Sequence, residues 1–112
     1  MIVIYHKPTC STSRKVLELI RAEGHAPIVI DYAKEGWTRG QLLGLFAAAD
    51  LTPAQALRTK GTDAAERGLI GADDDAILSA MIQNPLLVER PFVCGPGGTR
   101  LCRPIEAVRE TF

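Results

Sequence analysis

The hydrophobic residues change their spacing about ten residues into the chain. A short β-branched and aromatic run, Ile2 to Tyr5, predicts a buried strand. After Ser11 the apolar side chains recur at helix spacing, and these are Val16, Leu17, Leu19 and Ile20. Gly24 and Pro27 predict the end of that helix, and residues 28–30 predict a second strand. A strand, a helix and a strand within about 30 residues form a βαβ unit, so the two strands should be parallel.

The middle third of the sequence has the pattern of several helices. Thr38 followed by Gln41 matches a capping box, Trp37 is placed to pack on Leu42, and the helix should run to about Ala49. Thr52 and Pro53 repeat the start signal for a short helix ending near Arg58. Residues 73–83 predict a third helix with one apolar face, made by Ile77, Leu78, Met81 and Ile82.

The last third returns to a strand pattern. Residues 91–103, "PFVCGPGGTRLCR", predict an antiparallel hairpin around the Gly-Pro-Gly-Gly run. Pro104 can then begin a final helix that buries Ile105 and Val108. The order of elements predicts an α/β protein with a mixed sheet, and 112 residues suffice for one domain, residues 1–112.

Composition and charge exclude several classes of protein. Thirteen basic and thirteen acidic residues balance to a formal net charge of zero, which offers nucleic acid no long-range attraction. No stretch approaches the roughly 18 apolar residues of a membrane span. The apolar start, Met1 to Ile4, is too short for a signal peptide, so we expect a cytoplasmic protein without a membrane or nucleic-acid partner.

The three cysteines, Cys10, Cys94 and Cys102, are an odd number, which favours free thiols over a disulfide framework. Their spacing also lacks the close pairs typical of structural zinc sites. If the hairpin turn centres on Gly98, Cys94 and Cys102 would face each other across it. We nevertheless expect both of these thiols to be reduced.

Cys10 lies in the predicted turn between the first strand and the first helix. Unpaired backbone N–H groups and the positive end of the helix dipole favour a thiolate there, and His6 and Arg14 could add positive charge. A buried cysteine can equally be a small apolar filler. Position alone leaves both interpretations open.

Two familiar cysteine motifs are missing around Cys10. A dithiol redox motif needs a second cysteine at position 13, which is Ser13. A phosphatase-type loop needs an arginine six positions after the cysteine, and that residue is Val16. If Cys10 is a nucleophile, its second thiol must therefore come from Cys94, Cys102 or an external molecule such as glutathione.

Three segments resemble the glutaredoxin-coupled arsenate reductases. They are residues 6–14, "HKPTCSTSR", residues 84–93, "NPLLVERPFV", and residues 98–104, "GTRLCRP", and the resemblance covers nearly the whole chain. It implies a thioredoxin-like (glutaredoxin-like) fold with a mixed four-stranded sheet and an inserted helical segment at about residues 38–84.

The resemblance also implies a reaction, the reduction of arsenate to arsenite in arsenical resistance. Cys10 would attack arsenate, and glutathione and glutaredoxin would resolve the thiol-arsenate adduct, with no bound cofactor and no metal. The residues that would hold the oxyanion are Arg58, Arg90 and Arg103. The supporting residues would be His6, Ser13, Arg14 and Pro91, the last as a cis proline. Guanidinium groups suit this substrate because they present paired donors to an oxyanion.

Two other functions fit a similar fold. One is a transcriptional regulator that binds RNA polymerase, although such relatives often carry a dithiol switch, and Ser13 counts against it. The other is a paralogous glutathione-dependent thiol oxidoreductase with a different substrate, which would have less reason to keep all three arginines.

Overall fold

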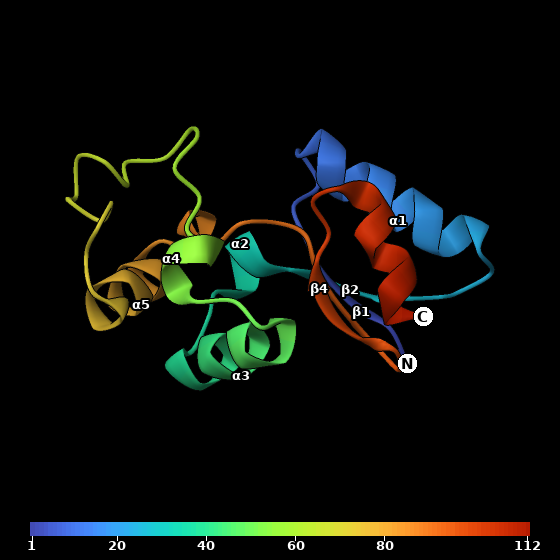
Figure 1. Ribbon diagram of the computed structural model, residues 1–112. Coiled ribbons are helices and arrows are strands. Elements are labelled where there is room, and N and C mark those ends of the chain that lie inside the picture. The colour runs from blue at the N-terminus through green and yellow to red at the C-terminus, as the bar shows by residue number, and fades with distance from the viewer. The chain divides into compact units, whose positions relative to one another are not determined.

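The computed structural model describes residues 1–112 (Figure 1). Its first elements form a βαβ unit. Strand β1 (Val3–His6), helix α1 (Ser11–Ala22) and strand β2 (Ile28–Asp31) follow one another. The two strands are parallel, as predicted, and their register runs from Val3 opposite Ile28 to His6 opposite Asp31. The first strand begins one residue later than predicted and includes His6, so this side chain comes from the strand rather than from the loop.

The predicted hairpin forms from β3 (Phe92–Gly95) and β4 (Gly98–Leu101). Strand β3 pairs antiparallel with β1, and the sheet has the order β2-β1-β3-β4. This confirms the prediction of a mixed four-stranded sheet. Because Tyr5 pairs with Phe92, the start of β3 lies beside the end of β1.

The register of the hairpin contradicts the expectation that Cys94 faces Cys102. Cys94 is opposite Thr99, because the turn consists of Pro96 and Gly97 and is not centred on Gly98. Cys102 belongs to the buried cluster that also contains Val93. Since neighbouring residues of a strand point to opposite faces, Cys94 points to the other face of the sheet.

The chain ends in a 3-10 helix, η2 (Ile105–Thr111), where a final helix was predicted. Val108 is fully buried, as expected, and Ile105 is partly buried against the same cluster. That cluster joins one face of the sheet to α1 and η2, and its buried members are Ile2, Ile4, Val16, Leu17, Ile20, Val93, Cys102 and Val108. A short helix, α2 (Tyr32–Glu35), follows β2 and was not predicted.

The chain forms two compact units. Residues 1–35 and 90–112 make a sheet unit, and residues 36–89 make a helical unit. The helical unit spans the predicted helical segment of about residues 38–84 with a few residues on either side. That the chain folds as one domain stays a prediction.

Three helices and a 3-10 turn make up the helical unit. They are α3 (Arg39–Ala49), α4 (Pro53–Ala56), α5 (Asp74–Gln83) and η1 (Pro85–Leu87). The predicted capping box forms at Thr38 with Gln41, and Thr52 caps α4 as predicted, where it also forms a capping box with Gln55. Helix α4 ends at Ala56, two residues before Arg58 and so near the predicted end. The chain then continues into a β-bridge at Leu57.

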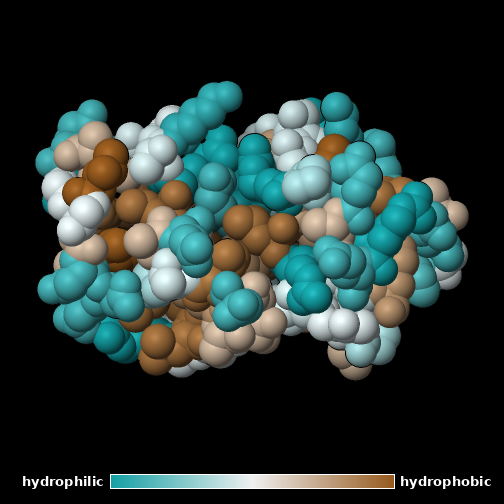
Figure 2. Space-filling view, viewed as in Figure 1, coloured by the Kyte–Doolittle hydropathy of each residue, from teal (hydrophilic) through white to brown (hydrophobic).

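The surface of the helical unit carries some exposed hydrophobic side chains. Figure 2 shows brown, hydrophobic atoms among the teal ones over α3 and α5, and these helices expose Leu43 and Ile82. Of the four residues predicted to form the apolar face of α5, Ile77, Leu78 and Met81 are buried, whereas Ile82 is 38% exposed. None of the helices has both the length and the apolar composition needed to cross a bilayer.

Candidate active site

Cys10 lies in a tight turn between the end of β1 and the start of α1. The backbone N–H of Cys10 donates to the Lys7 carbonyl at 3.0 Å, and the Cys10 carbonyl accepts the N–H of Arg14 at 3.0 Å. Nη1 of Arg14 donates to the Pro8 carbonyl at 3.0 Å, which ties the turn to the helix. Cys10 is the N-cap residue of α1, so its thiol lies where the sequence predicted it, at a helix start.

The surroundings of Cys10 favour its thiolate. Burial raises the pKa of Cys10, but the backbone N–H of Ser13, the guanidinium of Arg90 and the backbone N–H of Thr12 together lower it by more. The net pKa lies below the ordinary value for a cysteine. The N–H groups act because the first turn of a helix leaves them without internal partners. A lowered pKa at a helix start is the environment that a nucleophilic cysteine requires.

A hydrogen bond between His6 and Ser13 joins the strand before the turn to the helix after it. Nδ1 of His6 lies 2.6 Å from Oγ of Ser13, and Oγ also accepts the backbone N–H of Lys7 at 3.1 Å. Both side chains are buried. Ser13 therefore bridges strand and turn with its side chain, while its backbone N–H acts on Cys10.

The charge state of His6 follows from its surroundings. Burial lowers the pKa of His6, and the carboxylate of Asp31 opposes this shift. Arg21 and Arg14 add to the lowering. His6 is therefore neutral near pH 7, and its ring acts on the turn through the hydrogen bond with Ser13 rather than as a positive charge.

Arg90 and Arg103 are neighbours at the open end of the hairpin, one just before β3 and the other just after β4. Arg90 is 8% exposed, and its Nε is buried without a hydrogen-bond partner. Nη1 of Arg103 donates to the Arg90 carbonyl at 2.9 Å, and Arg103 itself is exposed. The Arg90–Pro91 peptide bond is cis, as the resemblance implied, and a second cis bond, Arg103–Pro104, was not expected. Cys10, Arg90 and Arg103 thus all lie in the sheet unit, with Arg90 next to Cys10 and Arg103 on the Arg90 carbonyl.

Arg58 lies in the helical unit and has a partner that the sequence analysis did not single out. Its Nη1 donates to Oε1 of Glu89 at 2.8 Å, and the two side chains are 12% and 23% exposed. Glu89 directly precedes Arg90 in the segment of residues 84–93, "NPLLVERPFV". An acidic residue beside a candidate arginine was the available signal.

A cavity of about 250 Å³ lies beside the turn but does not contain the thiol. Its lining includes His6, Arg14 and Arg21, and Cys10 is not part of it. The Cys10 thiol and Arg90 therefore lie outside this cavity.

Known proteins are similar to this chain over nearly its whole length. Residues 5–111 match the ArsC family. Arsenate reductase ArsI2 of Synechocystis sp. is 62% identical over 112 residues, which cover 98% of this chain and 80% of that protein. Arsenate reductase of Escherichia coli is 42% identical over 111 residues, covering 97% and 79% of the two chains.

A solved structure extends the similarity to three dimensions. The arsenate reductase from Vibrio cholerae superposes with a TM-score of 0.88 at 35% identity and covers 99% of this chain and 97% of that one. The agreement confirms the expected α/β fold of this group of proteins. On these sequence and structural matches, the chain belongs to the ArsC family.

Proposed function

We propose that this protein reduces arsenate to arsenite through one nucleophilic thiol, that of Cys10, with glutathione and glutaredoxin as the source of electrons. Arsenate reduction by an ArsC-family oxidoreductase is the activity that the named relatives carry. The residue roles and the electron donors are the parts that we add. The reducing cytoplasm, where glutathione is abundant, is the compartment that we expect.

The observation that supports this proposal best is the arrangement of Cys10 and Arg90. A thiol of lowered pKa lies at a helix start, next to a guanidinium that is almost completely buried. A thiolate attacks arsenic, and arsenate carries negative charge that would repel it. The guanidinium offsets that repulsion and presents paired donors to oxyanion oxygens.

The absence of a second cysteine at position 13 fits an external resolving thiol. In the first step the Cys10 sulfur bonds to arsenic, and one arsenate oxygen leaves as water after it receives protons. Glutathione then supplies the second thiol. Arsenic(V) gains two electrons and leaves as arsenite, while the two sulfurs lose them and form a mixed disulfide. Glutaredoxin, with further glutathione, would reduce this disulfide and restore the Cys10 thiol.

The other two arginines are proposed to share the oxyanion's charge. Arg103 is exposed and retains donors beyond the one used on the Arg90 carbonyl. Arg58 presents an unused Nε in the helical unit. Such donors stabilise the charge that develops on the departing oxygen, which lowers the barrier of the first step.

The test is arsenite production from arsenate with glutathione and glutaredoxin. The wild-type protein should form arsenite, and Cys10→Ser should form none, whereas Cys94→Ser should keep turnover because Cys94 has no part in the reaction. Arg90→Lys and Arg103→Lys should lose activity with the fold intact, because lysine cannot make paired contacts. A wild-type protein that forms no arsenite would overturn the proposal.

A further inference from the structure

We propose that Glu89 is a positioning residue for Arg58. It holds Nη1 of the guanidinium and leaves the opposite edge, Nε and Nη2, free for the oxygens of the oxyanion. The inference rests on the proposed function, in which Arg58 contacts arsenate, and it adds a residue whose role the family resemblance did not include.

The donors of Arg58 are used unequally. Nη1 donates to Oε1 of Glu89 at 2.8 Å, while Nε is buried and has no hydrogen-bond partner. A buried N–H without a partner is destabilising, so structures rarely retain one without a use. Nε lies on the same edge of the guanidinium as Nη2, and this edge matches two oxygens of a tetrahedral anion.

The backbone fixes where the two side chains begin. Leu57 and Val88 form an isolated antiparallel bridge. Next to it, the N–H of Arg58 donates to the Leu87 carbonyl and the N–H of Glu89 donates to the Ala56 carbonyl, each at 2.8 Å. Arg58 and Glu89 are therefore diagonal neighbours across the bridge, a separation that long side chains can span.

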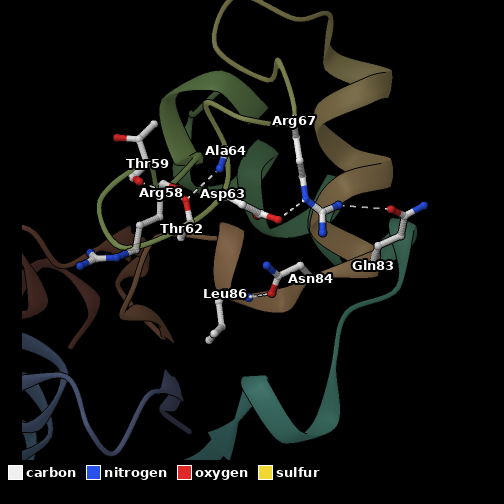
Figure 3. Close-up of polar contacts among 9 residues, drawn as sticks. All are labelled: Arg58, Thr59, Thr62, Asp63, Ala64, Arg67, Gln83, Asn84 and Leu86. Carbon is white, nitrogen blue, oxygen red and sulfur yellow. Dashed lines mark hydrogen bonds and ion pairs between the residues drawn. The ribbon is translucent and has the colours of Figure 1, made fainter.

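The segment after Arg58 is held as well. Oγ1 of Thr62 donates to the Arg58 carbonyl at 2.8 Å, and Figure 3 shows the Arg58 side chain extending away from the Asp63–Arg67 pair. The only carboxylate paired with Arg58 is thus that of Glu89. Both ends of the side chain are fixed, one through the backbone and the other through Nη1, so the free edge has a defined direction.

The limited exposure of the pair gives this contact more weight than an ordinary surface ion pair has. Exposed pairs contribute little because water and salt screen them. At 12% and 23% exposure, screening is weaker and fewer alternative rotamers are open to Arg58. Without Glu89 the guanidinium could turn, and a misplacement of about 1 Å can cost on the order of 100-fold in rate.

The experiment compares kcat/KM for arsenate in Glu89→Ala, Glu89→Gln, Arg58→Ala and the double variant Glu89→Ala/Arg58→Ala. We expect Glu89→Ala to lower kcat/KM by about 10- to 100-fold, with the KM for glutathione unchanged. Glu89→Gln keeps an oxygen acceptor at the same place and should restore most of the loss. In the Arg58→Ala background, Glu89→Ala should have no further effect, since Glu89 acts through Arg58.

Asp63→Ala is the matched control, because it removes another carboxylate that lies 2.8 Å from an arginine of the same unit. It should leave kcat/KM unchanged. If Arg58→Ala lowers kcat/KM and Glu89→Ala does not, the role of Glu89 is overturned while the proposed function stands. Additive losses in the double variant would also overturn it. A wild-type protein without arsenate reduction would instead mark the failure of the proposed function itself.

Discussion

Oγ of Ser13 lies 2.6 Å from Nδ1 of His6 and accepts the backbone N–H of Lys7 at 3.1 Å. Ser13 is fully buried and occupies the position where a dithiol motif has its second cysteine. One hydroxyl therefore ties the end of β1 to the first turn of α1. The turn that carries Cys10 is held between these two elements.

Replacing Ser13 by alanine should destabilise the protein. Ser13→Ala leaves Nδ1 of His6 and the N–H of Lys7 without their partner, so the free energy of unfolding should fall by about 1–3 kcal/mol. Urea denaturation measures this loss. Ser11→Ala, at an exposed position in the same helical turn, is the control and should change stability little. Equal stability of Ser13→Ala and the wild type would contradict the bridging role.

The pKa of Cys10 should depend on Arg90. The rate of alkylation by iodoacetamide follows the thiolate fraction, so its midpoint in pH should lie below that of a free cysteine, about 8.5. Arg90→Gln removes the positive charge, and the midpoint should move to higher pH. Arg100→Gln, whose guanidinium lies near Glu110, should leave the midpoint in place. An unchanged midpoint in Arg90→Gln would show that the helix start alone sets the pKa.

His6 predicts a pH dependence of stability. Burial lowers its pKa in the folded protein, so the unfolded chain binds more protons as the pH falls through about 6.5. Its contribution to stability is complete above that pH and decreases below it. Urea denaturation from pH 7.5 to 5.5 should show this decrease, and His6→Gln should make it smaller. His25→Gln, at an exposed site, is the control and should show the same decrease in stability as the wild type. If His6→Gln also shows the wild-type decrease, groups other than His6 cause it.

The predicted elements were those with a long local pattern. The change of spacing at Ser11 was enough to predict the βαβ unit, and Thr38 with Gln41 was enough to predict the start of α3. The helix α2, residues 32–35, is too short to show a period. The 3-10 form of residues 105–111 depends on whether each N–H donates to the carbonyl three or four residues earlier, and the spacing of apolar residues does not determine this.

The candidate site was predictable only in part. The place of Cys10 at a helix start is local, because it follows from the strand before it and the helix after it. The contact between Cys10 and Arg90 depends on the pairing of Tyr5 with Phe92, which joins segments far apart in the sequence. Family resemblance was the available guide to Arg90. Glu89 directly precedes Arg90, but the sequence alone does not pair it with Arg58, which lies 31 residues earlier.

The three cysteines should differ in reactivity. Burial raises the pKa of Cys102 to about 12, and its side chain is fully buried. Cys10 and Cys94 are partly exposed. A disulfide-exchange reagent should therefore modify Cys10 and Cys94 in the folded protein and Cys102 after denaturation. Mild oxidation should not join Cys94 to Cys102, because they point to opposite faces of the sheet. A Cys94–Cys102 disulfide found by mass spectrometry would refute the observed hairpin register.

A side chain at Gly95 should destabilise the protein, because the backbone of Thr111 packs against this residue of the hairpin. A Cβ added at Gly95 would lie 2.1 Å from the carbonyl oxygen of Thr111, and the N–H of Gly97 donates to the same oxygen at 3.0 Å. Gly95→Ala must push η2 away from the hairpin, which should lower the free energy of unfolding by about 1–3 kcal/mol or more. Gly44→Ala is the matched control, because it lies in α3 with open space around its Cβ. The control should gain about 0.5–1 kcal/mol from its higher helix propensity. Thermal denaturation of both variants tests the packing, and a Gly95→Ala protein as stable as the wild type would show that η2 does not lie against the turn.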